Sequence, residues 1–186
     1  TGSAQIGGIT GTTAGDGGKI TDSLVENYTG VSTGEETGGI VGYINSKTTI
    51  TDTIIKDSSI TGKRYLGGVS YTLKNGSVLS RVGVINVTVT ATDTSTSNEQ
   101  RVGGLFGILD SDACTIQYCY VTDSVITSAA GRMTGGLIGS SITSNHSISE
   151  TYVNAQVNTV VKIYSGSFIG NRATGYISNN FVAALN

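Results

Sequence analysis

One glycine-rich element recurs along this 186-residue chain at a nearly constant interval, and it limits the folds that the chain can adopt. The element reads Gly-Gly-apolar-x-Gly, and the first glycines of its successive copies lie 31, 29, 36, 32 and 31 residues apart. The copies begin at Gly7, Gly38, Gly67, Gly103, Gly135 and Gly166, and the third and last are degenerate. A period of this length is typical of proteins that stack one structural unit on the next.

A second signature lies between successive anchors and begins with an aliphatic residue. Its copies begin at Ile20, Ile50, Val78, Ile116, Ile148 and Ile177. A further large or apolar residue follows four positions later, at Leu24, Ile54, Val82, Tyr120, Tyr152 and Phe181. A unit of about 30 residues cannot bury such a face alone, so we expect each set to form a ladder of like side chains in a shared interior.

These two signatures predict an all-β fold, a right-handed parallel β-helix of about six coils with about 31 residues per repeat, in a single domain over residues 1–186. The anchor glycines are expected at tight corners, where φ is positive or the next coil excludes a Cβ. We take as structural Gly38, Gly39, Gly42, Gly67, Gly68, Gly103, Gly104, Gly107, Gly135, Gly136 and Gly139. Polar residues between the two ladders are expected where the coil bends, at Asp22, Asp52, Ser80, Tyr118, Glu150 and Asn179.

Two other architectures compete with this prediction. A helical solenoid disagrees with the apolar spacing of two and four and with the many β-branched residues. A Greek-key sandwich also has strands at regular spacing, but it does not explain glycine pairs at a fixed phase. The absence of proline fits a sheet with few edges.

Composition argues against several classes of partner. Only 13% of the residues are charged and the net charge is −2, which gives no electrostatic reason to expect nucleic acid as a partner. No apolar run approaches the roughly 20 residues of a transmembrane helix. We therefore expect neither a nucleic-acid partner nor a transmembrane segment.

Two stretches resemble a known repeat family. Residues 102–126 and 134–157 are similar to the GLUG repeat, which is named for its glycine-leucine-x-glycine anchor and often carries the cysteine-tyrosine pair seen here at Cys119 and Tyr120. The resemblance covers nearly the whole chain and is weaker where Tyr71 and Ser167 replace anchor glycines. It implies a β-solenoid and an extracellular or cell-surface location in microbial adhesin-like proteins or in the non-catalytic region of surface peptidases.

The residues offer little for catalysis. The single histidine, His146, cannot assemble a zinc site or a serine-protease triad, and we expect it on the surface. Asp22 and Asp52 share one repeat position in adjacent coils, so they are weak candidates for a carboxylate pair or a Ca²⁺ site, although a solvated corner ladder is the simpler interpretation. We expect no enzyme activity and no cofactor.

Several other residues stay open. Cys114 and Cys119 are interpreted as half-buried thiols, although a bridge across a tight turn is an alternative. Of the tyrosines, Tyr120 and Tyr152 are expected inside and the others too scattered for a sugar-binding surface. Glycosylation sequons start at Asn27, Asn75, Asn86 and Asn145, a number that the composition explains by chance.

The polar segment Thr88–Gln100 accounts for the longest interval and is predicted to be a loop that protrudes from the stack. The leading hypothesis for function is a structural and adhesive module, with adjacent repeats of the same protein as partners and a host protein or glycan as ligand. The chain is expected to be a segment of a longer repeat protein, or else a subunit that stacks end to end into a filament. A stalk or accessory domain of a surface peptidase or carbohydrate-active enzyme is the other alternative.

Overall fold

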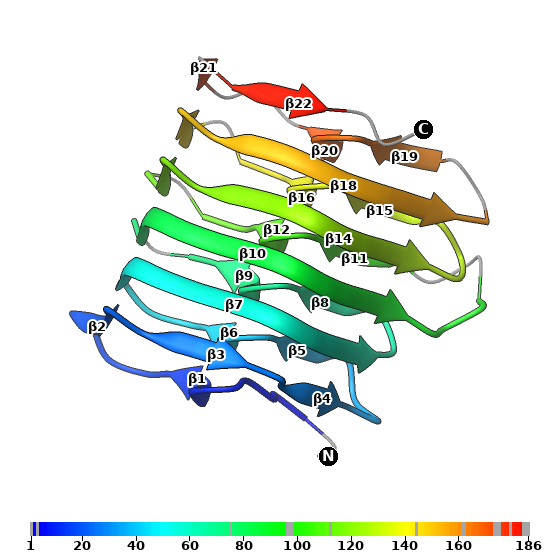
Figure 1. Cartoon of the computed structure of the whole chain (residues 1–186), viewed down its shortest axis with the longest axis horizontal. Helices are drawn as coiled ribbons and strands as arrows, with labels where there is room; N and C mark the ends of the chain where they lie inside the picture. The colour runs from blue at the N-terminus through cyan, green and yellow to red at the C-terminus, as the bar shows by residue number, and fades with distance from the viewer. Residues whose placement is uncertain are drawn as a thin grey trace.

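The computed structural model describes residues 2, 4–74, 76–95, 99–111, 113–143, 145–160, 163–172, 176–178 and 180–183. Over these residues the chain is a right-handed parallel β-solenoid of about five turns with about 31 residues per turn, and it contains no helix (Figure 1). Every strand pair that is described is parallel, and each strand pairs with its equivalent in the next turn. The predicted fold class and repeat length are confirmed, with about five turns rather than the six coils expected.

The largest sheet forms one wall of the solenoid and lies toward the viewer in Figure 1. In two coils, a single strand, β7 (Thr48–Gly62) or β10 (Val78–Ala91), runs along the whole wall. In the other coils, two or three shorter strands follow the same course. Its strands, from the first coil to the last, are β2 (Gly18–Thr21), β3 (Leu24–Glu26), β4 (Thr29–Val31), β7 (Thr48–Gly62), β10 (Val78–Ala91), β13 (Thr115–Gln117), β14 (Tyr120–Ser128), β17 (Ser147–Ser149), β18 (Tyr152–Thr159), β21 (Tyr176–Ser178) and β22 (Phe181–Ala183). We call it the long sheet.

Three smaller sheets close the other side of the coils. The first contains β5 (Glu36–Gly38), β8 (Tyr65–Gly67), β11 (Arg101–Gly103), β15 (Arg132–Gly135) and β19 (Ile163–Gly166). The second contains β9 (Ser70–Leu73), β12 (Phe106–Leu109), β16 (Ile138–Ser141) and β20 (Ile169–Arg172). The third pairs β1 (Thr10–Thr13) with β6 (Val41–Ile44).

The first predicted ladder is present with one change of residue. Ile20, Ile50, Ile116 and Ile148 are in register, and Ile50, Ile116 and Ile148 are fully buried. In the third coil the member is Leu79, which pairs with both Ile50 and Ile116, and Val78 points outward instead. The Cα atom of Ile177 pairs with that of Ile148, while its side chain lies outside the described part. Like side chains from successive coils therefore share one interior.

The second predicted ladder is wrong by one residue. Leu24 is 55% exposed, and its register partners are Ile54, Gly83 rather than Val82, Tyr120, Tyr152 and Phe181. The described side chains of this row are on the outer face. The interior ladder is formed by the next residues along the chain, Val25, Ile55, Val84, Val121 and Val153.

A left-handed residue explains this shift. Between Ile50 and Ile54 stands Asp52 with φ of 52°, and it interrupts the in–out alternation of the strand. Thr51 and Asp52 both face outward, so the residue four positions after Ile50 changes face. We call the equivalent left-handed positions the first kink: Asp22, Asp52, Arg81, Tyr118 and Glu150. The bend is where it was predicted, but its third-coil member is Arg81 rather than Ser80, and Asn179 lies outside the described residues.

A second kink follows five residues later in four coils, at Asn27, Asp57, Asn86 and Asp123. At both kinks, buried polar side chains replace part of the interrupted backbone pairing. Thr53 Oγ1 donates to the carbonyl of Thr51 at 2.8 Å. Ser124 Oγ accepts from the amide of Val87 in the preceding coil at 3.1 Å. The kinks therefore keep their backbone groups satisfied although they lie against the core.

Close packing, and not backbone conformation, explains the anchor glycines. None of the anchors has a positive φ. A Cβ on Gly39, Gly68 or Gly104 would collide with a carbonyl oxygen of the next coil. A Cβ on Gly38, Gly67, Gly103 or Gly135 would collide with the carbonyl three residues later, and Gly42, Gly107, Gly136 and Gly139 are equally enclosed by backbone atoms. The second of the two predicted reasons, close approach of backbone, is the one that holds.

Candidate functional site

The two candidate carboxylates lie at the first kink. There the structure adds a cation, Arg81, which the comparison of the repeats had placed one position away from this row. Asp22 and Asp52 are consecutive members of this row, and Arg81 is the next. Arg81 donates from Nε to Asp52 Oδ1 and from Nη2 to Asp52 Oδ2, both at 2.6 Å. This hydrogen-bonded guanidinium lowers the pKa of the Asp52 carboxyl. Asp52 therefore forms an ion pair in a row of exposed residues, which agrees with the interpretation of the two carboxylates as a solvated corner ladder.

The region around these carboxylates shows no metal-ligand geometry. Among the described residues, no group of three or more His, Cys, Asp and Glu side chains is placed to hold a metal ion. Asp16, in the Gly-rich turn before β2, accepts a hydrogen bond from the amide of Lys47 at 3.2 Å, which is a structural role.

His146 is buried, contrary to the prediction that it lies on the surface. It is 4% exposed, and its Nε2 lies 3.1 Å from Ser141 Oγ, which is itself 1% exposed. The residue directly precedes β17, where Ser147 pairs with Thr115, so His146 occupies the inward position next to Cys114 in the stack. The Ser141–His146 pair is closed to solvent, and it contributes to packing rather than to a surface site.

Neither Cys114 nor Cys119 forms a disulfide, and both are 1% exposed, so they are more deeply buried than predicted. Cys119 follows the first kink, at the place that Thr53 and Thr151 take in other coils. Its Sγ donates to the carbonyl of Gln117 at 3.2 Å, as the Thr151 hydroxyl does to Ser149 at 2.9 Å. Burial raises the pKa of Cys119 to about 12. The cysteine therefore acts as a small hydrogen-bonding side chain.

We expect both thiols to resist alkylation in the native protein at mildly alkaline pH and to react fully once the chain is denatured. Burial keeps Cys119 protonated and both sulfur atoms out of reach of the reagent. Cys119→Thr should change the free energy of unfolding by less than about 1 kcal/mol, because the hydroxyl can make the same bond. Mass spectrometry after timed labelling checks the first expectation. Rapid native labelling of either thiol would contradict it.

Three tyrosines that seemed scattered in the sequence come together. The ring centroids of Tyr65 and Tyr71 lie 5.0 Å apart and those of Tyr71 and Tyr43 lie 6.2 Å apart. The guanidinium groups of Arg64 and Arg101 approach the Tyr65 ring at 5.5 Å and 5.9 Å. Burial raises the pKa of Tyr71 to about 12. The ring faces are used within the protein, so this cluster stabilises the third coil, where Tyr71 replaces an anchor glycine.

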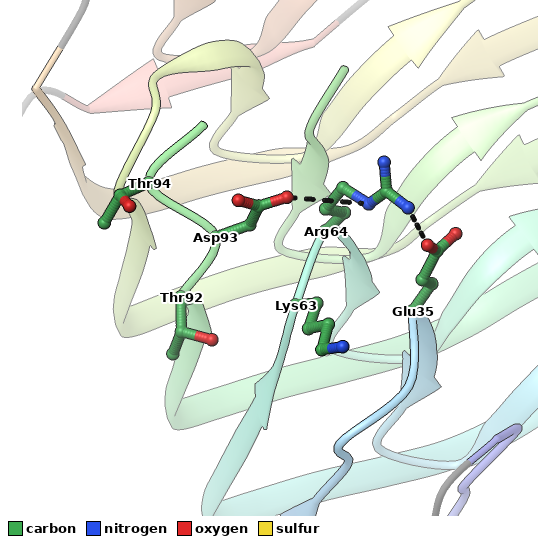
Figure 2. Close-up of a pocket in the computed structure, with 6 residues that line it drawn as sticks. All are labelled: Glu35, Lys63, Arg64, Thr92, Asp93 and Thr94. Atoms are coloured by element: carbon green, nitrogen blue, oxygen red, sulfur yellow. Dashed lines mark ion pairs between the residues drawn. The ribbon is translucent and has the colours of Figure 1, made fainter. Parts of the chain in front are cut away.

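A shallow pocket lies beside this cluster, where the long sheet ends (Figure 2). It is lined by Glu35, Lys63, Arg64, Thr92, Asp93 and Thr94. Arg64 forms an ion pair with Glu35, and its Nε lies 3.7 Å from Asp93 Oδ2. The positive and negative groups of the pocket are equal in number, so it offers no net charge to a ligand.

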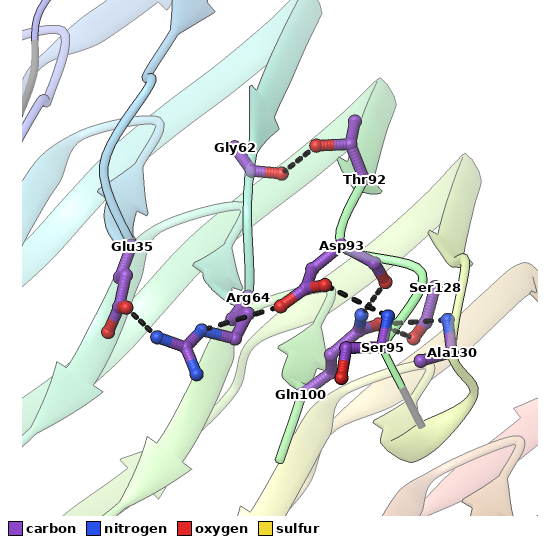
Figure 3. A network of polar contacts seen from close by, with 9 residues as sticks. All are labelled: Glu35, Gly62, Arg64, Thr92, Asp93, Ser95, Gln100, Ser128 and Ala130. Atoms are coloured by element: carbon purple, nitrogen blue, oxygen red, sulfur yellow. Dashed lines mark hydrogen bonds and ion pairs between the residues drawn. The ribbon is translucent and has the colours of Figure 1, made fainter. Parts of the chain in front are cut away.

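The segment predicted as a protruding loop is shorter and better anchored than expected. Strand β10 continues to Ala91, so Thr88 to Ala91 belong to the long sheet. Thr92 then donates through its Oγ1 to the carbonyl of Gly62 at 3.1 Å, and Asp93 Oδ1 accepts from the amide of Ser95 at 2.9 Å. Gln100 is fully buried below this turn (Figure 3).

Gln100 links three segments through its side-chain amide. Its Nε2 donates to the carbonyl of Asp93, and its Oε1 accepts from Ser128 Oγ and, at 3.2 Å, from the amide of Ala130 (Figure 3). One side chain thus joins the described start of the insertion to the turn of the following coil. No sequence pattern indicates these contacts, because Gln100 lies in a run of polar residues.

We expect Gln100→Ala to lower the free energy of unfolding by about 2–3 kcal/mol, because it leaves the buried amide of Ala130 and the Asp93 carbonyl without their partner. Thr94→Ala is the control: Thr94 is exposed and lies in the same turn, and its truncation should cost less than about 0.5 kcal/mol. Urea denaturation measures both values. Equal effects of the two substitutions would show that Gln100 does not fasten the turn.

The outer face of the long sheet contains the row that the sequence placed inside. Tyr120 and Tyr152 are register partners in adjacent coils, and both are half-buried on this face rather than in the interior. Tyr118 at the first kink is 54% exposed beside them. The predicted placement of Tyr120 and Tyr152 is therefore wrong, and this face is the strongest candidate for contact with a partner.

Two sequons occupy equivalent positions. Asn27 and Asn86 are both exposed at the second kink, and Asn145 is exposed before β17, whereas Asn75 lies outside the described residues.

Within the described part of the chain, no helix is long and apolar enough to cross a membrane. Comparison with protein families, with curated proteins and with solved structures finds no match.

Proposed function

We propose that this chain is a non-catalytic structural and adhesive repeat module of a secreted or cell-surface microbial protein. The observation that supports the structural part is the interior ladder, in which Ile50, Leu79, Ile116 and Ile148 stack in register with 0% exposure. Each coil buries its apolar face only against its neighbours, so coils added in series give a stiff spacer. The surface location is proposed from the expected resemblance of residues 102–126 and 134–157 to the GLUG repeat.

A stiff spacer requires that single coils do not open separately. We expect the amides of β7, β10 and β14 to exchange with solvent deuterium at rates set by one common unfolding event. These strands occupy successive coils and share backbone pairing along nearly their whole length. Hydrogen exchange followed by mass spectrometry tests this part. Fast, independent exchange of one of the three strands would contradict the structural role.

The adhesive and non-catalytic parts are tested by incubating the full chain with a panel of polysaccharides, glycans and proteins of extracellular matrices. The expected result is retention of a ligand with no conversion of it. Turnover that disappears in Asp52→Asn would overturn the non-catalytic part. That residue is the right control because the carboxylate pair at the first kink was the best catalytic candidate, and the Arg81 ion pair keeps its pKa low.

A further inference from the structure

The outward strand positions of the long sheet carry no charged side chain across three consecutive coils. By strand register, its outward positions are Val78, Ser80, Gly83, Ile85, Thr88 and Thr90 in the third coil, Thr115, Gln117, Tyr120, Thr122, Val125 and Thr127 in the fourth, and Ser147, Ser149, Tyr152, Asn154, Gln156 and Asn158 in the fifth. Of these, Ser80 and Gly83 are buried, and Ser80 accepts a hydrogen bond from Arg81 at 3.3 Å. The charged residues of these strands stand at the kinks. A partner that contacts only the strand positions between the kinks is therefore bound without ion pairs.

The first two coils do carry charged side chains at their outward positions, so the absence of charge is confined to the later coils. Their outward positions include Lys19 in β2, and Glu26 and Lys56, which form an ion pair of 2.7 Å. The uncharged part thus begins at β10 and coincides with the part that carries the two tyrosines. We call it the neutral face.

Tyr120 lies along this face rather than standing away from it. A Cβ on Gly83, its register partner in the third coil, would be 2.7 Å from Tyr120 Cε2 and closer still to the hydroxyl end of the ring. Because Gly83 has no side chain, the ring can lie across the backbone of the third coil. Tyr152 follows Tyr120 at the spacing of neighbouring strands, about 4.8 Å.

Polar groups without charge surround the two rings. Gln117 and Ser149 precede them in the same coils, and Thr122 and Asn154 follow them. A pyranose ring combines an apolar C–H face, which packs on an aromatic ring, with hydroxyl groups that bond to amides and hydroxyls. The neutral face offers both kinds of contact in adjacent coils, so an extended saccharide can follow the direction in which the coils stack.

We propose that the neutral face binds a neutral glycan, with Tyr120 and Tyr152 as the stacking residues and Gln117 and Asn154 as hydrogen-bonding residues. This inference rests on the adhesive part of the proposed function and names its ligand class and its face. An anionic glycan is disfavoured, because the cation beside this face, Arg81, already forms an ion pair with Asp52.

The test is binding of the full chain to an array of neutral and acidic glycans, followed by titration calorimetry with the best neutral oligosaccharide. Tyr120→Ala and Tyr152→Ala should each weaken binding by about tenfold or more, equivalent to about 1.4 kcal/mol. Tyr164→Ala is the matched control, because Tyr164 is 53% exposed but lies in β19, outside the long sheet. Binding should change little between low and high salt. Thermal unfolding of each variant confirms that it is folded.

The outcomes separate the proposals. If glycans bind but folded Tyr120→Ala and Tyr152→Ala bind as tightly as the unmodified chain, the adhesive function stands and the neutral face is the wrong site. If only acidic glycans bind, or binding falls steeply with salt, the ligand class is wrong. If no glycan binds and sedimentation shows a dimer that the tyrosine variants lose, the face is an interface between copies. The hydrogen-exchange test of the spacer is independent of all three results.

Discussion

Gly104→Ala is expected to lower the free energy of unfolding by about 3 kcal/mol, although it adds a single methyl group. The new Cβ would collide with the carbonyl oxygen of Gly136 in the next coil and lie 2.9 Å from Val121 Cγ1. To make room, the fourth and fifth coils must separate where Leu105 donates to the Leu137 carbonyl at 2.8 Å. The backbone carbonyl on one side and the buried, β-branched Val121 on the other leave no flexible group that can move away, so the strain cannot relax locally.

The control is Gly18, a strand glycine whose added Cβ would meet no backbone atom within 4 Å. A Cβ on Gly18 in β2 would meet only Thr48, at 3.5 Å, and Gly18 has no positive φ. Gly18→Ala should therefore be neutral or stabilise by up to about 1 kcal/mol, since alanine restricts the unfolded chain. Chemical denaturation of both variants gives the comparison. If Gly104→Ala unfolds at the same denaturant concentration as the unmodified chain, close approach does not explain the anchors.

The sequence was sufficient for the fold because its signal is periodic and involves backbone geometry. Glycine pairs at one phase predict a place where successive coils touch, and the first ladder predicts one interior row. Ile50, Ile116 and Ile148 are in register and fully buried, as predicted. In the third coil two aliphatic residues, Val78 and Leu79, adjoin, so pattern alone did not fix the phase. Choosing Val78 instead of Leu79 as the ladder member shifted the third coil by one residue. It put Ser80 in place of Arg81 at the first kink and Val82 in place of Gly83 in the next row.

The candidate site was harder to predict because its contacts do not follow the repeat. Tyr71 stands in place of an anchor glycine and packs between Tyr43 and Tyr65, which come from other positions of the repeat. Residues that gather by reaching between coils leave no signature at a fixed interval. The predicted surface position of His146 was wrong for a related reason. Its neighbours in sequence are typical of a surface turn, but its register in the stack directs it inward.

Adjacent residues in β7 should respond very differently to the same substitution. Ile55→Asn is expected to cost about 4 kcal/mol and to leave the chain largely unfolded at moderate temperature, because it buries an amide with no partner and removes an interior ladder member. Ile55 is 0% exposed, between Val25 and Val84 in its ladder. Ile54→Asn should cost about 1 kcal/mol or less, because Ile54 faces outward.

The contrast between Ile54 and Ile55 tests the kink itself, because an unbroken strand alternation counted from Ile50 would place Ile54 inside and Ile55 outside. Asp52 in the left-handed region reverses that order. Circular dichroism during thermal unfolding measures both variants against the unmodified chain. A larger loss of stability in Ile54→Asn than in Ile55→Asn would mean that the kink does not change the phase of the strand. The row containing Tyr120 and Tyr152 would then be interior, and the neutral face would lose the two rings on which its proposed role depends.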